Sequence, residues 1–268
     1  GWRVRNDHRT GLNSFSNMKY GICTLSIVPL RAEPSDKSEL VSQVLYGELF
    51  KILEQRKKWV KIRQEYDGYQ GWIDRKQYTQ ISEDDFKQSL KIPEVYCADL
   101  VDFVSQEDGG LRSVVMGSAL QHLNVLNHQF EGNNLAGPFQ SRQRLIQTAL
   151  LYINTPYLWG GRTPFGIDCS GFTQLVYRLN HLALPRDAKD QAKLGEVLSF
   201  IEESTPGDLA FFDNAEGLII HVGIIMEDHY IIHAHGQVRI DRLDQTGIFN
   251  TETKTYTHKL RVIKKIIP

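Results

Sequence analysis

The hydrophobic pattern of this 268-residue chain changes its period near residue 142, and that change constrains the fold more than any other feature. Before it, apolar and polar residues alternate in short runs such as residues 59–63, and a period of two is typical of β-strands. After it, apolar residues from Leu145 to Ile153 recur at helical spacing, which predicts an amphipathic helix over residues 142–154. We therefore expect a β-rich first half and a differently built C-terminal domain.

Two small β-barrels are predicted in the first half of the chain. Residues 18–82 contain several short strand-like runs, with an Asp-Gly hairpin turn at residues 67–68. Residues 83–140 show a weaker pattern of short strand-like runs, with a Gly-Gly turn at residues 109–110. This pattern predicts a second, divergent barrel. Residues 1–17 are polar and aperiodic, which indicates an N-terminal arm.

The C-terminal domain, residues 141–268, is predicted to belong to the α+β class. A second helix begins near Cys169, and strand-like runs follow it to the end of the chain. Helices followed by an antiparallel sheet are typical of that class. The predicted strands are residues 208–212, 219–226, 230–235 and 259–267.

Charge and composition exclude two classes of function. The chain has 31 Lys and Arg against 32 Asp and Glu, so it lacks the basic excess with which nucleic-acid binders neutralise phosphates. No apolar run approaches the ~18 residues that a membrane-spanning helix needs. The chain begins with Gly1 and Trp2 rather than Met, which we interpret as the result of a removed leader; an intact cytosolic protein is the alternative.

The sharpest local feature is the segment GIDCSGF at residues 166–172. A glycine-rich loop delivers Cys169 to the first turn of a helix, where free N–H groups and the helix dipole stabilise a thiolate and lower the thiol pKa. Such a cysteine can act as a nucleophile. The alternative is that Cys169 is a small buried apolar residue, as free cysteines usually are.

A nucleophilic cysteine needs a base, and several histidines fall on consecutive predicted strands. His221 opens one strand, and His233 and His235 lie two positions apart on the next, so they share a face. Paired strands could place one imidazole beside the thiolate and another behind it. Each histidine could instead be structural, and His229, His233 and His235 could together bind zinc.

These features resemble the NlpC/P60 family of cell-wall cysteine peptidases, whose fold is papain-like. The resemblance implies that Cys169 is the nucleophile, His221 the general base and His233, twelve positions further on, the third catalytic residue. It also implies that Tyr157 helps the Cys169 N–H to bind the oxyanion, and that the site holds no metal. The matching motifs are YLWGG at residues 157–161, DCSGF at 168–172, PGDL at 206–209, HVGI at 221–224 and IHA at 232–234.

Most of residues 18–80 resembles a bacterial SH3 (SH3b) domain. The matching segments are VPLR at residues 28–31, YGE at 46–48, WVKI at 59–62 and GYQGWI at 68–73. SH3-like barrels before an NlpC/P60 domain are similar in order to the γ-D-glutamyl-L-diamino acid dipeptidyl-peptidases (dipeptidyl-peptidase VI).

That resemblance implies a substrate cleft with contributions from both domains. Asp187 matches the acidic residue that would hold a substrate ammonium group, although it could instead cap the helix that follows it. The first barrel would add an acidic residue and a tyrosine, for which Glu48 and Tyr78 are the candidates. The alternatives are a solvated Glu48, a packed Tyr78 and a barrel that only binds the wall. The remaining residues expected to line the cleft are Trp159, Asp168 and Ser170.

We therefore predict a cysteine peptidase that cuts the γ-D-Glu–diamino acid bond of murein peptides with a free N-terminal L-Ala and releases L-Ala-γ-D-Glu. The alternatives are an endopeptidase on intact peptidoglycan that uses its barrels as wall anchors, and a non-catalytic wall-binding protein. No cofactor and no nucleic acid are expected. We expect a monomer in the bacterial cell envelope, periplasmic or exported, with the cytoplasm as the alternative. The diamino acid, lysine or diaminopimelate, is left open.

Overall fold

Seven antiparallel strands form the first unit of the computed structural model, which describes residues 18–268; the predicted arm at residues 1–17 lies outside the described residues. Alternation turns every second side chain inward, so that Val60 and Ile62 are fully buried against Phe50 in one apolar core, as in a small barrel. The strand order is β3-β2-β6-β5-β4-β1-β7. The strands are β1 (Lys19–Ile22), β2 (Ile27–Arg31), β3 (Leu40–Leu45), β4 (Leu49–Gln55), β5 (Trp59–Gln64), β6 (Gln70–Asp74) and β7 (Thr79–Ile81).

The region from 83 to 140 consists of short elements that pack on the barrel. Strand β9 pairs with β10 and β8 with β11, in two separate two-stranded sheets, so the second barrel stays a prediction. Tyr46 of the barrel is buried in the same apolar cluster as Val104 and Val114 of this region. The elements are α1 (Glu83–Ser89), β8 (Val95–Cys97), β9 (Val101–Ser105), β10 (Leu111–Val115), α2 (Leu123–Leu126) and β11 (Asn134–Ala136).

The C-terminal domain is built on a second antiparallel sheet of order β14-β20-β15-β16-β17-β18-β19. Strand β19 also pairs with β20, so the strands from β15 to β20 form a closed ring. Its interior is filled by side chains such as Phe212, Ile231 and Ile248. Its outer face, through residues such as Val222 and Ile224, packs against Phe172 and Val176 of the second predicted helix.

The predicted helices and strands of this domain are present, together with several short elements that were not predicted. The helix predicted over residues 142–154 ends at Leu150, and β18 and β19 were not predicted. The elements are α3 (Arg142–Leu150), β12 (Arg162–Thr163), β13 (Gly166–Ile167), α4 (Cys169–Leu179), α5 (Ala188–Gln191), β14 (Glu196–Leu198), η1 (Ile201–Glu203), β15 (Leu209–Asp213), β16 (Ile219–Ile225), η2 (Glu227–His229), β17 (Tyr230–His235), β18 (Gln237–Leu243), β19 (Gly247–Asn250) and β20 (Thr255–Lys265).

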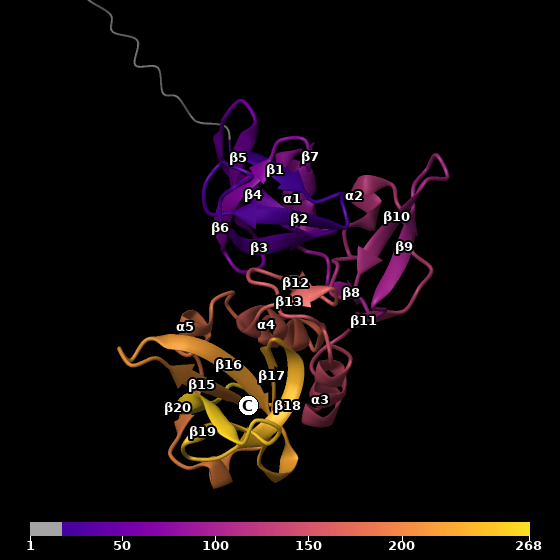
Figure 1. Ribbon diagram of the computed structural model, residues 1–268. Coiled ribbons are helices and arrows are strands. Elements are labelled where there is room, and N and C mark those ends of the chain that lie inside the picture. The colour runs from indigo at the N-terminus through magenta and orange to yellow at the C-terminus, as the bar shows by residue number, and fades with distance from the viewer. Residues whose placement is uncertain (1–17) are drawn as a thin grey trace, which may run out of the picture.

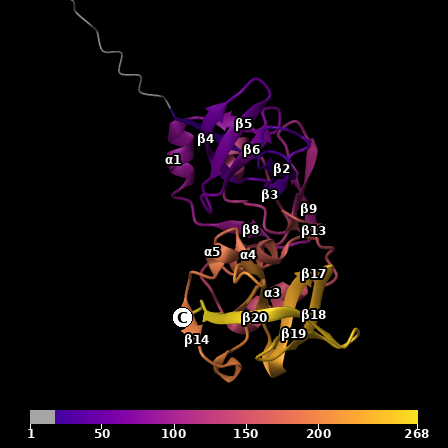
Figure 2. The ribbon, with the colours of Figure 1, turned by 60° about the vertical axis from the view of Figure 1, so that its left-hand side comes forward.

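Helix α4 lies at the junction of the two main units. Figures 1 and 2 both show α4, α5 and the β12–β13 hairpin between the barrel and the C-terminal sheet. Every residue of α4 is buried, because the sheet covers one side and the barrel the other. Within residues 18–268, no helix combines the length and the apolar character that crossing a membrane requires.

Candidate active site

The loop before α4 presents Cys169 at the first position of the helix. Asp168 is the N-cap, and its Oδ1 accepts the N–H of Gly171 at 2.7 Å, which fixes this turn. Residue 171 has to be glycine, because a Cβ there would lie 2.4 Å from the carbonyl oxygen of Gly161. The segment therefore holds the Cys169 N–H and sulfur at a helix N-terminus, as the sequence predicts.

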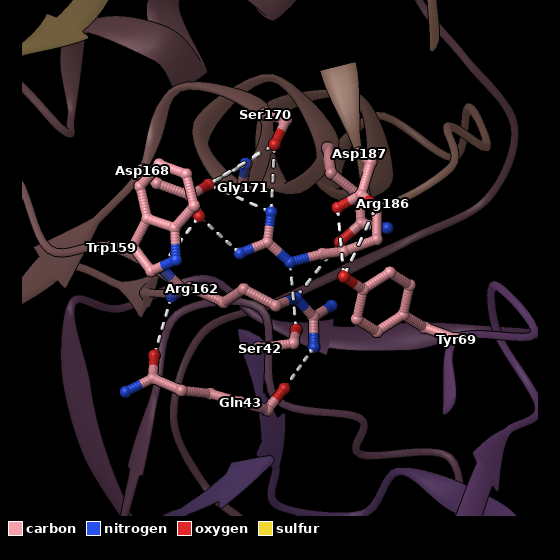
Figure 3. A network of polar contacts seen from close by, with 12 residues as sticks. Ser42, Gln43, Tyr69, Trp159, Arg162, Asp168, Ser170, Gly171, Arg186 and Asp187 are labelled. Carbon is pink, nitrogen blue, oxygen red and sulfur yellow. Dashed lines mark hydrogen bonds and ion pairs between the residues drawn. The ribbon is translucent and has the colours of Figure 1, made fainter. Parts of the chain in front are cut away.

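A buried arginine ties this turn to the barrel (Figure 3). Arg186 donates to both carboxylate oxygens of Asp168, at 2.9 and 2.7 Å, and to the Ser170 hydroxyl at 3.0 Å. Its Nε donates to the Ser42 hydroxyl of the barrel at 2.9 Å. The Gly160 N–H also binds Asp168, at 2.9 Å. The Asp168 carboxylate is thus engaged by protein groups, and it orients the cysteine turn rather than offering a free charge to a ligand.

The two predicted catalytic histidines lie side by side on paired strands. His221 of β16 and His233 of β17 are buried, and the His221 Nε2 lies 2.8 Å from the His233 Nδ1. Gly223 lies opposite His233 in the ladder, and a Cβ there would lie 2.7 Å from the Ile231 side chain and 3.0 Å from the Cβ of His233. The main chain of Val222, next to His221, lies beside the Cys169 thiol.

A carboxylate that was not predicted from the sequence lies behind His233. Asp241 of β18 has an Oδ2 2.7 Å from the His233 Nε2. Arg239, on the same strand, donates to both oxygens of Asp241, at 2.8 and 2.9 Å. The sequence gives little signal for it, because in β18, QVRIDRL, the apolar Ile240 is exposed while the neighbouring Asp241 is buried.

A third imidazole, that of His258 on β20, stacks on His221 with ring centroids 4.0 Å apart and an angle of 20°. Ring nitrogens of His221, His233 and His258 lie within 4.8 Å of one another, a group that could hold a metal ion. This group shares only His233 with the zinc site considered from the sequence, which also needed His229 and His235. Two of these nitrogens, one from His221 and one from His233, already share a hydrogen bond. This arrangement suits proton transfer better than metal binding.

Burial decides the protonation states of this site. It raises the pKa of the Cys169 thiol to about 12, and the charge of Asp168 adds to the increase. Burial also lowers the pKa of His221 well below its ordinary 6.5, and His233 and His258 add to the decrease. This direction is opposite to the lowering of the thiol pKa expected from the helix terminus, because lost hydration opposes the thiolate. We therefore expect a neutral thiol and a neutral imidazole in the resting enzyme.

These shifts predict the pH dependence of catalysis. A base whose pKa is lowered stays unprotonated to lower pH, so we expect kcat/KM to persist below pH 6.5 and to fall only as His221 becomes protonated in stronger acid. Alkylation of Cys169 by iodoacetamide should keep accelerating above about pH 9, because the thiolate accumulates only near pH 12. Both rates can be measured from about pH 4 to about pH 10. An alkylation rate that levels off below about pH 7 would indicate a preformed thiolate–imidazolium pair and contradict this prediction.

A pocket of about 410 Å³ opens beside Cys169, between the barrel and the C-terminal domain. From the barrel side, the Glu39 carboxylate accepts the indole N–H of Trp159 at 2.8 Å. The Tyr69 hydroxyl donates to Asp187 at 3.1 Å, as Figure 3 shows. Asp187 stands at the N-cap position of α5, but its side chain makes no capping hydrogen bond. Its carboxylate instead lines the pocket. The predicted cleft residues that line the pocket are Tyr157, Trp159, Asp168, Ser170 and Asp187.

The prediction that Glu48 and Tyr78 reach the cleft is wrong. Glu48 is 3% exposed and forms ion pairs with Arg162, at 3.1 Å, and Arg178, away from the pocket. Tyr78 packs edge-on against Phe50, with ring centroids 5.6 Å apart. The barrel does supply an acidic residue and a tyrosine, but they come from the loops before β3 and β6. These residues are Glu39 and Tyr69.

Comparisons with known proteins agree with this architecture. Residues 154–258 match the NlpC/P60 family, and residues 30–77 match the bacterial dipeptidyl-peptidase Sh3 domain. Dipeptidyl-peptidase 6 of Lysinibacillus sphaericus is 28% identical over 256 residues, which cover 81% of this chain and 89% of the relative. The γ-D-glutamyl-L-lysine dipeptidyl-peptidase of Bacillus subtilis is 25% identical over 241 residues, covering 81% and 75%. The crystal structure of an NlpC/P60 family protein from Bacillus cereus superposes with a TM-score of 0.76 at 20% identity, over 93% of this chain and 100% of that chain, which shows a shared fold.

Proposed function

The chain is a cysteine peptidase with an NlpC/P60 domain and a bacterial SH3 domain, and on that premise we propose that it releases L-Ala-γ-D-Glu from murein peptides. The bond to be cut joins γ-D-Glu to the diamino acid of peptides that have a free N-terminal L-Ala. The observation that carries this proposal is the pair of carboxylates, Glu39 and Asp187, in the pocket that holds Cys169.

Two carboxylates in a partly enclosed pocket favour a ligand with an ammonium group. Burial raises the pKa of Asp187, which means that the surrounding protein solvates its charged form less well than water does. An incoming ammonium group would supply that missing stabilisation, with Tyr69 holding the carboxylate in place through its hydroxyl. Glu39 faces the same space from the barrel, held by the Trp159 indole. An N-acylated or glycan-linked peptide lacks the N-terminal ammonium group, and the barrel would obstruct its extension.

The catalytic cycle follows from the contacts of His221. Its Nε2 forms a hydrogen bond with His233, so Nδ1 is the nitrogen that can accept a proton. Nδ1 takes the proton of the Cys169 thiol as the sulfur attacks the γ-carbonyl carbon of D-Glu. The oxyanion is held by the Cys169 N–H and the Tyr157 hydroxyl, and burial raises the pKa of Tyr157, which keeps this hydroxyl protonated. Collapse of the adduct breaks the C–N bond, and the leaving amine takes the proton from His221. His221 then deprotonates water, which cleaves the thioester and restores the thiol.

We infer further that the first barrel spans residues 18–82 and that residues 83–140 form a divergent SH3-like module. Residues 141–268, which follow them in the chain, have a papain-like arrangement. The β9–β10 hairpin and the core shared with Tyr46 support the first inference. The position of Cys169 at the start of a buried helix, against an antiparallel sheet that carries both histidines, supports the second.

Digestion of L-Ala-γ-D-Glu-diamino acid peptides with and without an N-terminal acetyl group tests the proposal. We expect dipeptide release from the free peptide at a kcat/KM roughly 100-fold above that of the blocked one, because charge-assisted hydrogen bonds between an ammonium group and carboxylates in a partly enclosed pocket are worth a few kcal/mol. Glu39→Gln and Asp187→Asn should reduce that ratio, whereas Asp36→Asn, an exposed carboxylate in the same loop as Glu39, should not.

Two results would contradict the proposal in different ways. Equal rates on both peptides would remove the free-amine requirement and favour an endopeptidase on intact peptidoglycan. No release from either peptide by protein with an intact Cys169 thiol would favour a non-catalytic wall-binding protein.

A further inference from the structure

A row of buried polar groups extends behind His221 and ends at Asp241. The three residues come from adjacent strands, β16, β17 and β18, and each is at most 5% exposed. Their contacts are sequential, from the His221 Nε2 to the His233 Nδ1 at 2.8 Å, and from the His233 Nε2 to the Asp241 Oδ2 at 2.7 Å. Both ring nitrogens of His233 are therefore occupied, and the protons along the row can be assigned.

The assignment starts at Asp241, because an ionised carboxylate can only accept hydrogen bonds. Burial alone would raise the pKa of Asp241, but hydrogen bonds from His233 and Arg239 lower it overall, so it is ionised. The His233 Nε2 must then carry a proton, which leaves the Nδ1 of neutral His233 bare. A bare Nδ1 requires a proton on the His221 Nε2. The Nδ1 of His221 is therefore unprotonated and free to act as a base.

We propose that Asp241 is a positioning residue that fixes the tautomers of both histidines and stabilises the positive charge that His221 acquires from the thiol. The inference rests on the proposed role of His221 as the base. The rings that pack on His221 from other strands, His258 and Phe212, carry no negative charge, and His235 lies beyond His258. The charge that faces the row from its far end is that of Asp241, held in place by Arg239.

Nitrogen NMR of the unmodified enzyme, labelled with ¹⁵N in its histidines, tests the assignment directly, since protonated and bare ring nitrogens differ strongly in chemical shift. We expect His221 and His233 to be protonated at Nε2 and bare at Nδ1 near neutral pH. Protonation of His233 at Nδ1 would overturn the proposal. This measurement requires neither a substrate nor a variant, so it decides the matter even if the proposed substrate is not hydrolysed or a substituted protein fails to fold.

The substitution Asp241→Asn tests the catalytic consequence. An amide carries no charge and can donate as well as accept, so it no longer imposes one tautomer on His233. We expect the Nδ1–H form of His221 to become detectable and kcat to fall roughly 100-fold with KM nearly unchanged. Glu252→Gln is the matched control, because Glu252 contacts the same Arg239, at 3.6 Å, but is exposed and has no contact with His233. An Asp241→Asn variant with native kcat, or an equal loss in Glu252→Gln, would overturn the proposal.

Discussion

Cys169→Ala is expected to reduce kcat/KM for dipeptide release by at least ~10⁴-fold, the loss typical of removing the nucleophile of a catalytic triad. Without the sulfur no thioester can form, and the remaining groups only position the peptide. Because Glu39, Asp187 and Trp159 are untouched, binding of a free-amine peptide, measured by calorimetry, should persist with a dissociation constant close to that of the native enzyme. The loss should therefore appear in kcat.

The other two cysteines provide matched controls for this experiment. Cys23 and Cys97 are also free and buried, but they belong to the apolar cores of the barrel and of the middle region. Cys23→Ala and Cys97→Ala should leave kcat/KM of the folded protein unchanged, and a chelator should not affect the native enzyme. Residual hydrolysis by Cys169→Ala that a chelator removes would indicate that a metal bound by the histidine group carries the reaction instead.

The positions of the three proposed catalytic residues could be predicted from the sequence, because local pattern determines where they lie. The loop-to-helix switch placed Cys169 at a helix start, and strand alternation placed His221 and His233 on one side of neighbouring strands. Asp241 was missed because β18 alternates less regularly between apolar and polar residues, and its aspartate is buried only through its contacts with His233 and Arg239.

The barrel side of the pocket was harder to predict, because it depends on how two domains dock. Glu39 meets Trp159, and Tyr69 meets Asp187, across more than 100 positions of sequence. A single sequence has no periodic signal for such contacts. Glu48 was misplaced for the same reason, since its buried partners lie in a distant part of the chain that the barrel sequence does not reveal.

Glu48 should therefore determine stability rather than specificity, and Glu48→Gln is expected to lower the free energy of unfolding by about 3–5 kcal/mol. The substitution leaves Arg162 and Arg178 without their shared carboxylate, although both guanidinium groups are buried at the junction of the barrel and α4. The rings of Tyr66 and Tyr96, stacked on Arg178 at 4.3 and 4.7 Å, cannot replace a full negative charge.

Thermal unfolding followed by circular dichroism measures this effect, and a loss of that size corresponds to a decrease in Tm of roughly 10 °C. Glu54→Gln is the control, because Glu54 also pairs with an arginine, Arg56 at 2.7 Å, but with both side chains about half exposed. Exposed pairs of this kind contribute less than about 1 kcal/mol, so its Tm should barely change. At temperatures where Glu48→Gln remains folded, its KM for the free-amine peptide should be native. A raised KM with an unchanged Tm in Glu48→Gln would contradict this prediction. It would indicate that Glu48 contacts the peptide substrate, because only such a residue would show that combination.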